Sequence, residues 1–281
     1  MIYIFIDEGV KKVAIEYVIS ISQKINAKII ENRNEQITIL KQIYSNNKYI
    51  FIGIRYTSYL KINYDNVYYV NLEPLTCNGK YSKYNFLNEV LLFNRNYPKI
   101  KLLDYSKENI EILKNYNIKS KYLPYQVNYN EIKNYEKNDY DIVLCCSWNE
   151  RIKNIFDRIS TFSKSYPIGN PPLWYNERDN ILFRSKILIN LHHRENDYNI
   201  LQELRITRCI LNKIIIISEK SLNNDLYYLS KYIIFCEYVD IVNKAKDVLN
   251  NYEYYYNKIY SDLNIELIDY QLEKELPSFD I

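Results

Sequence analysis

The segment KILINLHHRENDYNILQELRITRCILNKIIIISE, residues 186 to 219, decides the fold class. It begins with an apolar strand, passes through a loop that carries both histidines of the chain, continues into a helix and closes with a second apolar strand. This order of elements is typical of a parallel sheet with helical crossovers. Because such sheets bind ligands at the carboxyl ends of their strands, we expect the polar residues of this loop, with Ser218 and Glu219, to lie at the ligand edge.

The same alternation of short apolar runs and helical patterns extends over the rest of the chain. In the first part it predicts strands over 3–6, 28–31, 49–54, 67–71, 100–104 and 121–123, with helices over 10–25, 35–44, 83–93 and 107–116. In the second part it predicts strands over 141–146, 186–191, 213–218 and 232–236, with helices over 150–162, 176–185, 199–211 and 239–260.

The polar segment 126–139 separates the two parts and lacks apolar periodicity, so it is predicted to be a linker. We therefore expect an α/β fold of two Rossmann-like domains that face each other across a cleft. Residues 1–125 form the first domain, residues 126–263 form the second, nucleotide-binding domain, and residues 264–281 form a C-terminal helix and tail.

The amino-acid composition supports a globular core and excludes some classes of function. The 281 residues are 47% hydrophobic, which is enough for a sizeable core. The 37 basic and 34 acidic residues are spread evenly along the chain, which argues against a nucleic-acid partner. The 32 tyrosines accompany abundant Ile, Asn and Lys, all favoured by A/T-rich codons, so codon usage explains them better than a stacking surface does.

Membrane and metal signals are absent from the sequence. It has no apolar run of eighteen residues, and the apolar start meets Asp7 and Glu8 too early for a signal peptide, so we expect a cytoplasmic protein. Its five cysteines show no CxxC spacing and are expected to be reduced and buried. Asp139 and Asp141 resemble a metal-binding DxD pair, but they lead into a buried strand, and we expect no metal site there.

A cationic pair opens the helix after the strand 141–146. Arg151 and Lys153 follow a loop that contains Ser147 and Asn149. Free N–H groups and the helix dipole at a helix start, together with two cations, suit a diphosphate. The alternative is that both are solvated surface cations.

Two glutamates accompany the histidine loop. Glu195 lies in the loop and Glu203 in the helix, seven residues apart, and Asp197 is placed to cap that helix. Their carboxylates could bind the hydroxyl groups of a sugar and a ribose. The alternative is that Glu195 is a first-turn surface acid and Glu203 an exposed helix residue, and for Glu203 this alternative is disfavoured. One histidine, His192, is expected to face the crevice, and the alternative is a purely structural histidine. Arg205 is interpreted as a domain-packing or loop-fixing residue.

The first domain offers several acids at strand ends. Any of them could serve as a general base, and the sequence does not choose among Asp7, Glu8, Glu73 and Asp104.

With these residues in view, the chain resembles the glycosyltransferases of the GT-B fold, in the broad group related to retaining family four. The resemblance is carried by YLPYQV at 122–127, DIVLCCSWNERIKN at 141–154, the segment 186–219 and YIIFCEYVDIVNKAKDVL at 232–249. NLEP at 71–74 and LLDYSKEN at 102–109 are similar to divergent glycosyltransferases of large DNA viruses.

The resemblance implies roles for individual residues. Glu195 matches a glutamate near the donor sugar, Glu203 one on the ribose, and Arg151 with Lys153 the basic pair that holds the donor diphosphate. The chain departs from the family where Asn196, Asp197 and Tyr198 replace a glycine-rich turn, and where Lys213 replaces a small glycine turn.

These inferences combine into one functional hypothesis. The protein would be a metal-independent glycosyltransferase, without a cofactor, that moves a sugar from a nucleotide-diphosphate sugar to a hydroxyl of a glycan or glycoprotein, in the host cytoplasm if it is viral. Glu195 and His192 would be catalytic, and the donor would be bound by Ser147, Asn149, Arg151, Lys153 and Glu203.

Two other readings of the sequence remain open. The absent glycines and the lack of an obvious base favour a catalytically inactive, transferase-like glycan-binding or structural protein. A sugar-nucleotide epimerase is the third hypothesis, and it is disfavoured because the chain has only two histidines.

Overall fold

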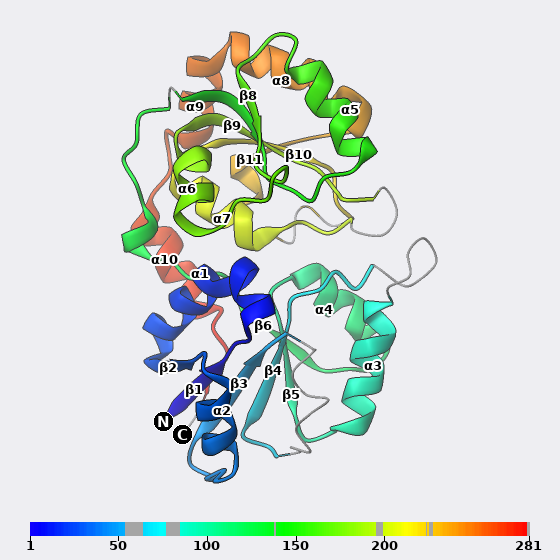
Figure 1. The fold of residues 1–281 in the computed structure, drawn as a ribbon, viewed down its shortest axis with the longest axis vertical. Coiled ribbons are helices and arrows are strands. Elements are labelled where there is room, and N and C mark those ends of the chain that lie inside the picture. The colour runs from blue at the N-terminus through cyan, green and yellow to red at the C-terminus, as the bar shows by residue number, and fades with distance from the viewer. Residues whose placement is uncertain are drawn as a thin grey trace. The chain divides into compact units, whose positions relative to one another are not determined.

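The computed structural model describes residues 1–53, 64–76, 85–137, 139–194, 199–222, 224 and 227–279. The chain forms two compact units (Figure 1): Met1–Asn128 with Glu266–Ile281, and Tyr129–Ile265. Each unit contains one parallel sheet with helical crossovers. The predicted α/β class with two Rossmann-like domains is therefore confirmed.

The first unit is built on a six-stranded sheet in the order β2-β1-β3-β4-β5-β6. All its neighbouring strands run parallel. Its strands are β1 (Ile2–Phe5), β2 (Ala27–Ile30), β3 (Lys48–Ile52), β4 (Val67–Asn71), β5 (Lys101–Asp104) and β6 (Ser120–Tyr122). Its helices are α1 (Glu8–Ile25), α2 (Arg33–Leu40), α3 (Phe86–Asn96), α4 (Lys107–Lys114) and α10 (Ile265–Lys274).

Short polar side chains start the helices of this unit. Asp7 accepts a hydrogen bond from the backbone N–H of Val10, and Ser106 caps α4 through the N–H of Asn109. These contacts satisfy N–H groups that the first helical turn cannot pair internally. At the other end of α1, Asn26 takes a left-handed conformation with φ of 50°, which ends the helix directly before β2.

The C-terminal helix packs on the first unit. Lys24 of α1 forms an ion pair of 2.8 Å with Asp269 of α10. Gln126 donates from Nε2 to the backbone oxygen of Leu272 at 3.1 Å, and its own N–H donates to Ser20. The start of the predicted linker is thus buried in the first unit, because Gln126 satisfies backbone and side-chain groups there.

The second unit is built on a five-stranded parallel sheet in the order β11-β10-β9-β7-β8. Its strands are β7 (Tyr140–Leu144), β8 (Ser165–Pro167), β9 (Ser185–Asn190), β10 (Ile215–Glu219) and β11 (Ile233–Cys236). Its helices are α5 (Glu150–Ile159), α6 (Tyr175–Phe183), α7 (Glu203–Leu211), α8 (Ile241–Asn250) and α9 (Tyr252–Tyr260), with short 3₁₀ turns at Tyr129–Glu131, Ser230–Tyr232 and Tyr238–Asp240. The three central strands are almost fully buried, as their continuous apolar sequence predicts.

The structure corrects three details of the predicted elements. The helix expected over 199–211 begins only at Glu203, because Ile200 and Leu201 are buried in a non-helical segment and Gln202 has φ −85° and ψ 68°. The helix expected over 239–260 divides at Asn251, whose side-chain amide bonds the backbone oxygen of Asp247 and closes α8. The edge strand β8 was not predicted, since three residues show no periodicity.

Four cysteines lie in the described part of the chain, and all are free thiols. Cys145, Cys209 and Cys236 are buried and Cys146 is half-buried, as expected for reduced core residues. Cys77 lies outside the described residues.

Candidate functional site

The order of the second sheet reverses beside β7. The chain passes from β7 to β8 on one side, and then crosses to β9 on the other side. In open parallel sheets the carboxyl ends of the two strands at such a switch point border the ligand crevice. The loops that follow β7 and β9 therefore border the candidate site.

Asn149 joins these two loops. Its Oδ1 accepts from the backbone N–H of Ile152 at 2.9 Å, which caps α5. Its Nδ2 donates to the backbone oxygen of His193 at 2.6 Å and lies 3.2 Å from the Nδ1 atom of the same histidine. The side chain thus places the start of α5 against the end of β9.

Arg151, the second residue of α5, makes several contacts at this edge. Its guanidinium pairs end-on with the Glu219 carboxylate: Nη1 donates to Oε2 at 3.0 Å and Nη2 donates to Oε1. Nη1 also donates to the backbone oxygen of His192 at 3.0 Å. Bidentate pairing of this kind fixes the plane of the guanidinium as well as its position.

Tyr238, which follows β11, also contacts Arg151. The guanidinium carbon lies 3.8 Å from the centre of the Tyr238 ring, a cation–π arrangement. The Tyr238 hydroxyl donates to the backbone oxygen of Arg151 at 2.7 Å. Residues at the ends of β9, β10 and β11 thus converge on a single cation at the carboxyl edge of the sheet.

The predicted catalytic residue His192 belongs to this cluster through its backbone. Its N–H donates to Glu219 Oε2 at 3.1 Å, and its Nε2 lies 3.4 Å from the backbone oxygen of Glu219. The residue is only 2% exposed. The other predicted catalytic residue, Glu195, lies outside the described residues, as does Asp197.

Two predicted donor-binding residues are exposed beside the cluster. Ser147 is exposed in the loop before α5. The side chain of Lys153 is 49% exposed, and its Nζ lies 3.9 Å from Asp157 on the same helix. Arg151 and Lys153 do not meet, because residues two apart lie on different sides of a helix.

Glu203 lies at the start of α7 and not inside it, contrary to the predicted boundary. It is 3% exposed, and its backbone oxygen accepts from the Thr207 hydroxyl at 2.8 Å. Burial raises the pKa of Tyr227 well above its usual range, and the charge of Glu203 adds to that effect. A carboxylate at this position gains from the positive end of the helix dipole.

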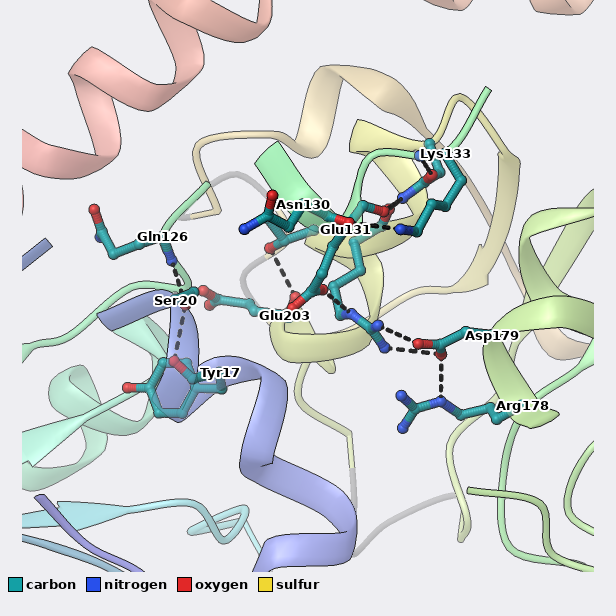
Figure 2. A network of polar contacts seen from close by, with 12 residues as sticks. Tyr17, Ser20, Gln126, Asn130, Glu131, Lys133, Arg178, Asp179 and Glu203 are labelled. Atoms are coloured by element: carbon teal, nitrogen blue, oxygen red, sulfur yellow. Dashed lines mark hydrogen bonds and ion pairs between the residues drawn. The ribbon is translucent and has the colours of Figure 1, made fainter. Parts of the chain in front are cut away.

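The other end of α7 holds the segment that was predicted to be a linker. Arg208, 5% exposed, donates to Glu131 at 2.6 Å and to Asp179 of α6 at 2.6 Å. Asn212 donates to the backbone oxygen of Glu131 and accepts from the N–H of Lys133. Figure 2 shows Glu131, Lys133 and Asp179 around this network. The segment is therefore fixed to the end of α7 by the ion pair of Arg208 with Glu131 and by the two hydrogen bonds of Asn212.

Glu219 and Tyr238 were not assigned to the site from the sequence. Glu219 was expected at the ligand edge but was given no role there, and Tyr238 was one of many tyrosines. The strand-end position was the usable signal, because an acid that closes an apolar strand lies at the ligand edge. That both residues contact Arg151 follows only from the order of the sheet, in which β10 and β7 lie on either side of β9.

The candidate bases of the first unit occupy different environments. Asp7 caps α1 and Glu8 lies in its first turn. Asp104 is fully buried at the end of β5 and accepts from Asn71 Nδ2 at 2.8 Å, Ser106 N at 2.9 Å and Asn109 Nδ2 at 3.0 Å. Burial raises the pKa of Asp104 to about 7 despite these hydrogen bonds. Such an enclosed carboxylate organises the strand ends around it.

Neither a clustered metal site nor a membrane helix is found within the described ranges. No group of three or more His, Cys, Asp or Glu side chains there could hold a metal ion. Asp141 instead accepts from Lys186 Nζ at 2.8 Å. No described helix combines the length and apolar character needed to cross a membrane.

Comparison with known sequences finds viral relatives. No family model matches the chain. It is 33% identical over 159 residues to the uncharacterized protein L138 of Acanthamoeba polyphaga mimivirus, covering 54% of this chain and 18% of L138. It is 30% identical over 169 residues to the uncharacterized protein L140 of the same virus, covering 57% of this chain and 55% of L140. The chain thus spans about half of L140 and less than a fifth of L138.

Comparison with solved structures identifies the fold. TarM aligns with 86% of this chain and 57% of its own, at a TM-score of 0.56 and 13% identity. An α1,3-fucosyltransferase with GDP-fucose aligns with 100% of this chain and 91% of its own, at a TM-score of 0.40 and 13% identity. TarM is a GT-B glycosyltransferase, so the two domains of this chain have the fold found in that class.

Proposed function

Because both units have the Rossmann-like fold of the GT-B glycosyltransferases, we propose that this protein is itself a glycosyltransferase. It takes a sugar from a nucleotide-diphosphate sugar and transfers it to a hydroxyl of a glycan or glycoprotein, without a metal ion. A relationship to retaining family four and a location in the host cytoplasm belong to the same proposal.

One observation carries this proposal. Residues at the ends of three strands of the second unit, β9, β10 and β11, converge on Arg151 at the carboxyl edge of the sheet, near the amino end of α5. A helix amino end with a cation fixed near it is suited to bind a diphosphate, because the helix dipole and the guanidinium both contribute positive charge there. Lys153 and Ser147, both exposed beside this seat, are available to add a mobile cation and a hydroxyl.

The remaining donor contacts are assigned by chemistry. Glu203, at the first turn of α7, would accept hydrogen bonds from the ribose hydroxyls. Glu195 and His192 would orient the donor sugar. As the bond between the sugar and the diphosphate breaks, negative charge grows on the leaving diphosphate, and Arg151, Lys153 and the α5 dipole would stabilise it. Asp104 is a poor candidate for the base, because it is fully buried and already accepts three hydrogen bonds.

The decisive assay follows the release of nucleoside diphosphate. The purified protein is incubated with UDP-, GDP-, ADP-, CDP- and dTDP-linked sugars, with and without EDTA, and donor binding is measured in parallel by calorimetry. Release of one nucleoside diphosphate that is unchanged by EDTA supports the proposal. If no donor binds, the assignment of the second unit as a nucleotide-sugar domain is wrong.

A matched pair of variants locates the diphosphate. Lys153 and Arg158 are both exposed cations of α5, but Lys153 lies at its amino end and Arg158 in its last turn. Lys153→Ala should weaken donor binding roughly three- to tenfold, the effect of one partly screened charge, whereas Arg158→Ala should leave it unchanged. Glu203→Gln, which keeps the side-chain size, should weaken binding of nucleotides without altering the binding of inorganic pyrophosphate.

A second candidate function is a transferase-like protein that binds a donor or a glycan without turnover. The observation in its favour is the ion pair between Arg151 and Glu219. The carboxylate offsets the positive charge that is expected to stabilise the leaving diphosphate. Binding of a nucleotide sugar with no release of nucleoside diphosphate, across a panel of glycan acceptors, would support this function instead.

A further inference from the structure

Arg151 keeps one edge of its guanidinium open. A guanidinium has five N–H groups. The Nη1 donors reach His192 O and Glu219 Oε2, and one Nη2 donor reaches Glu219 Oε1. Within the described ranges, the Nε donor and the second Nη2 donor have no acceptor. These two donors lie side by side, in the fork geometry that binds two oxygens of a phosphate.

Glu219 leaves the Nε–Nη2 edge of Arg151 open and fixes its direction. Its carboxylate occupies the far end of the guanidinium, and Tyr238 covers one face at 3.8 Å. The carboxylate is itself fixed, since its Oε2 accepts from the backbone N–H of His192. With its end and one face occupied, Arg151 can offer an anion only the Nε–Nη2 edge.

Glu219 also changes the electrostatics of the seat. The side chains of Arg151 and Glu219 are 18% and 11% exposed, so water screens their charges only in part. A diphosphate bound to the open edge is attracted by the guanidinium and repelled by the carboxylate behind it. The pair therefore recognises phosphate through directed hydrogen bonds while adding little net positive charge.

We infer that Glu219 is a positioning residue of the donor site, which orients Arg151 and limits how tightly the product nucleoside diphosphate is held. This inference rests on the proposed glycosyltransferase function. During transfer the acceptor hydroxyl oxygen forms the new bond to the sugar and loses its proton to a base or to water. The oxygen between the sugar and the diphosphate takes the electron pair of the breaking bond, so the product carries more negative charge than the donor. A seat with an uncompensated arginine would hold that product longer, and release would limit turnover.

The test replaces the charge of Glu219 while keeping its size. Glu219→Gln should bind the nucleoside diphosphate product roughly three- to thirtyfold more tightly than the unchanged protein, with a steeper loss of affinity as salt is raised. Its kcat should fall by a similar factor while KM also falls. Glu219→Asp, which keeps the charge, should retain an affinity close to that of the unchanged protein.

Glu237→Gln is the matched control. Glu237 is an acid that follows β11 at the same sheet edge, but it is exposed and pairs with Lys220. Its replacement should change neither product affinity nor kcat. Thermal unfolding of each variant establishes that it is folded under the assay conditions.

The outcomes separate the two proposals. If the unchanged protein binds no nucleoside diphosphate, the proposed function fails. If it binds one and Glu219→Gln binds equally or more weakly, Glu219 is only part of the scaffold and the present inference is overturned. A purely structural role cannot produce tighter product binding together with slower turnover.

Discussion

The amide of Asn149 donates a 2.6 Å hydrogen bond to the backbone oxygen of His193, 44 residues away along the chain. The same side chain caps α5 through the backbone N–H of Ile152. One residue therefore holds both the helix start and the neighbouring loop at the switch point of the second sheet. The geometry of the candidate donor site depends on this double contact.

Replacement of Asn149 by alanine should remove both contacts. We expect the free energy of unfolding to fall by about 2 kcal/mol, because a lost cap costs about 1 kcal/mol and a lost, partly buried hydrogen bond a similar amount. Asn32 is a suitable control, since it caps the exposed start of α2. Asn32→Ala should cost only the cap. Equal losses for the two variants in urea denaturation would show that the bond to His193 contributes nothing.

Gly169 packs the turn after β8 against the end of β7. A Cβ atom at this position would lie 1.7 Å from the backbone oxygen of Cys146, a distance that requires the backbone to move. Gly169→Ala should therefore lower the free energy of unfolding by about 2–4 kcal/mol. In Gly9→Ala the new Cβ meets only the Asp7 side chain at 3.2 Å, in the first turn of α1. That control should be neutral or stabilising by up to about 1 kcal/mol.

Arg208 neutralises two carboxylates that are largely buried. Arg208→Ala leaves Glu131 and Asp179 without this partner, and we expect a loss of about 3–5 kcal/mol of unfolding free energy. The segment 129–137 should also become easier to cleave, because Glu131 no longer holds it to α7. Limited proteolysis with fragment mass determination measures this directly. Arg158→Ala serves as the control, and an uncut segment in Arg208→Ala would contradict the expectation.

Asp104 should make stability depend on pH. Burial raises the pKa of its carboxyl from 3.8 to about 7, so between these values the folded protein binds more protons at this site than the unfolded chain. The contribution of this group to the free energy of unfolding therefore decreases as pH rises from about 4 to about 7, by a few kcal/mol in total. Above pH 7 the carboxyl is ionised in both states, and its contribution changes no further.

Asp104→Asn isolates this contribution from the other groups that titrate in the same range. The variant removes the ionisation but keeps a side chain of similar size, although Asn71 then faces a second amide. Urea denaturation at several pH values should give a shallower decrease of stability with pH than the unchanged protein shows. Identical pH dependence in both proteins would mean that Asp104 ionises as freely in the folded state as in the unfolded chain.

Much of the fold could be predicted from the sequence because its signals are local. Continuous apolar runs such as 186–191 predict buried parallel strands, and the structure has β9 there. The two elements that were predicted wrongly were missed for reasons that are also local. β8 is too short to show a period, and Asn251 divides a helix by a side-chain contact that no apolar pattern encodes.

The site was predictable only as a location. That Arg151, His192 and Glu219 lie at the carboxyl edge follows from their positions beside strand ends, which the sequence determines by itself. That Arg151 pairs with Glu219 and stacks on Tyr238, while Lys153 stays in solvent, was decided by the tertiary structure. The physical reason is that ion pairing depends on which strands become neighbours and on the direction of each side chain, and strand order is fixed by packing of the whole sheet.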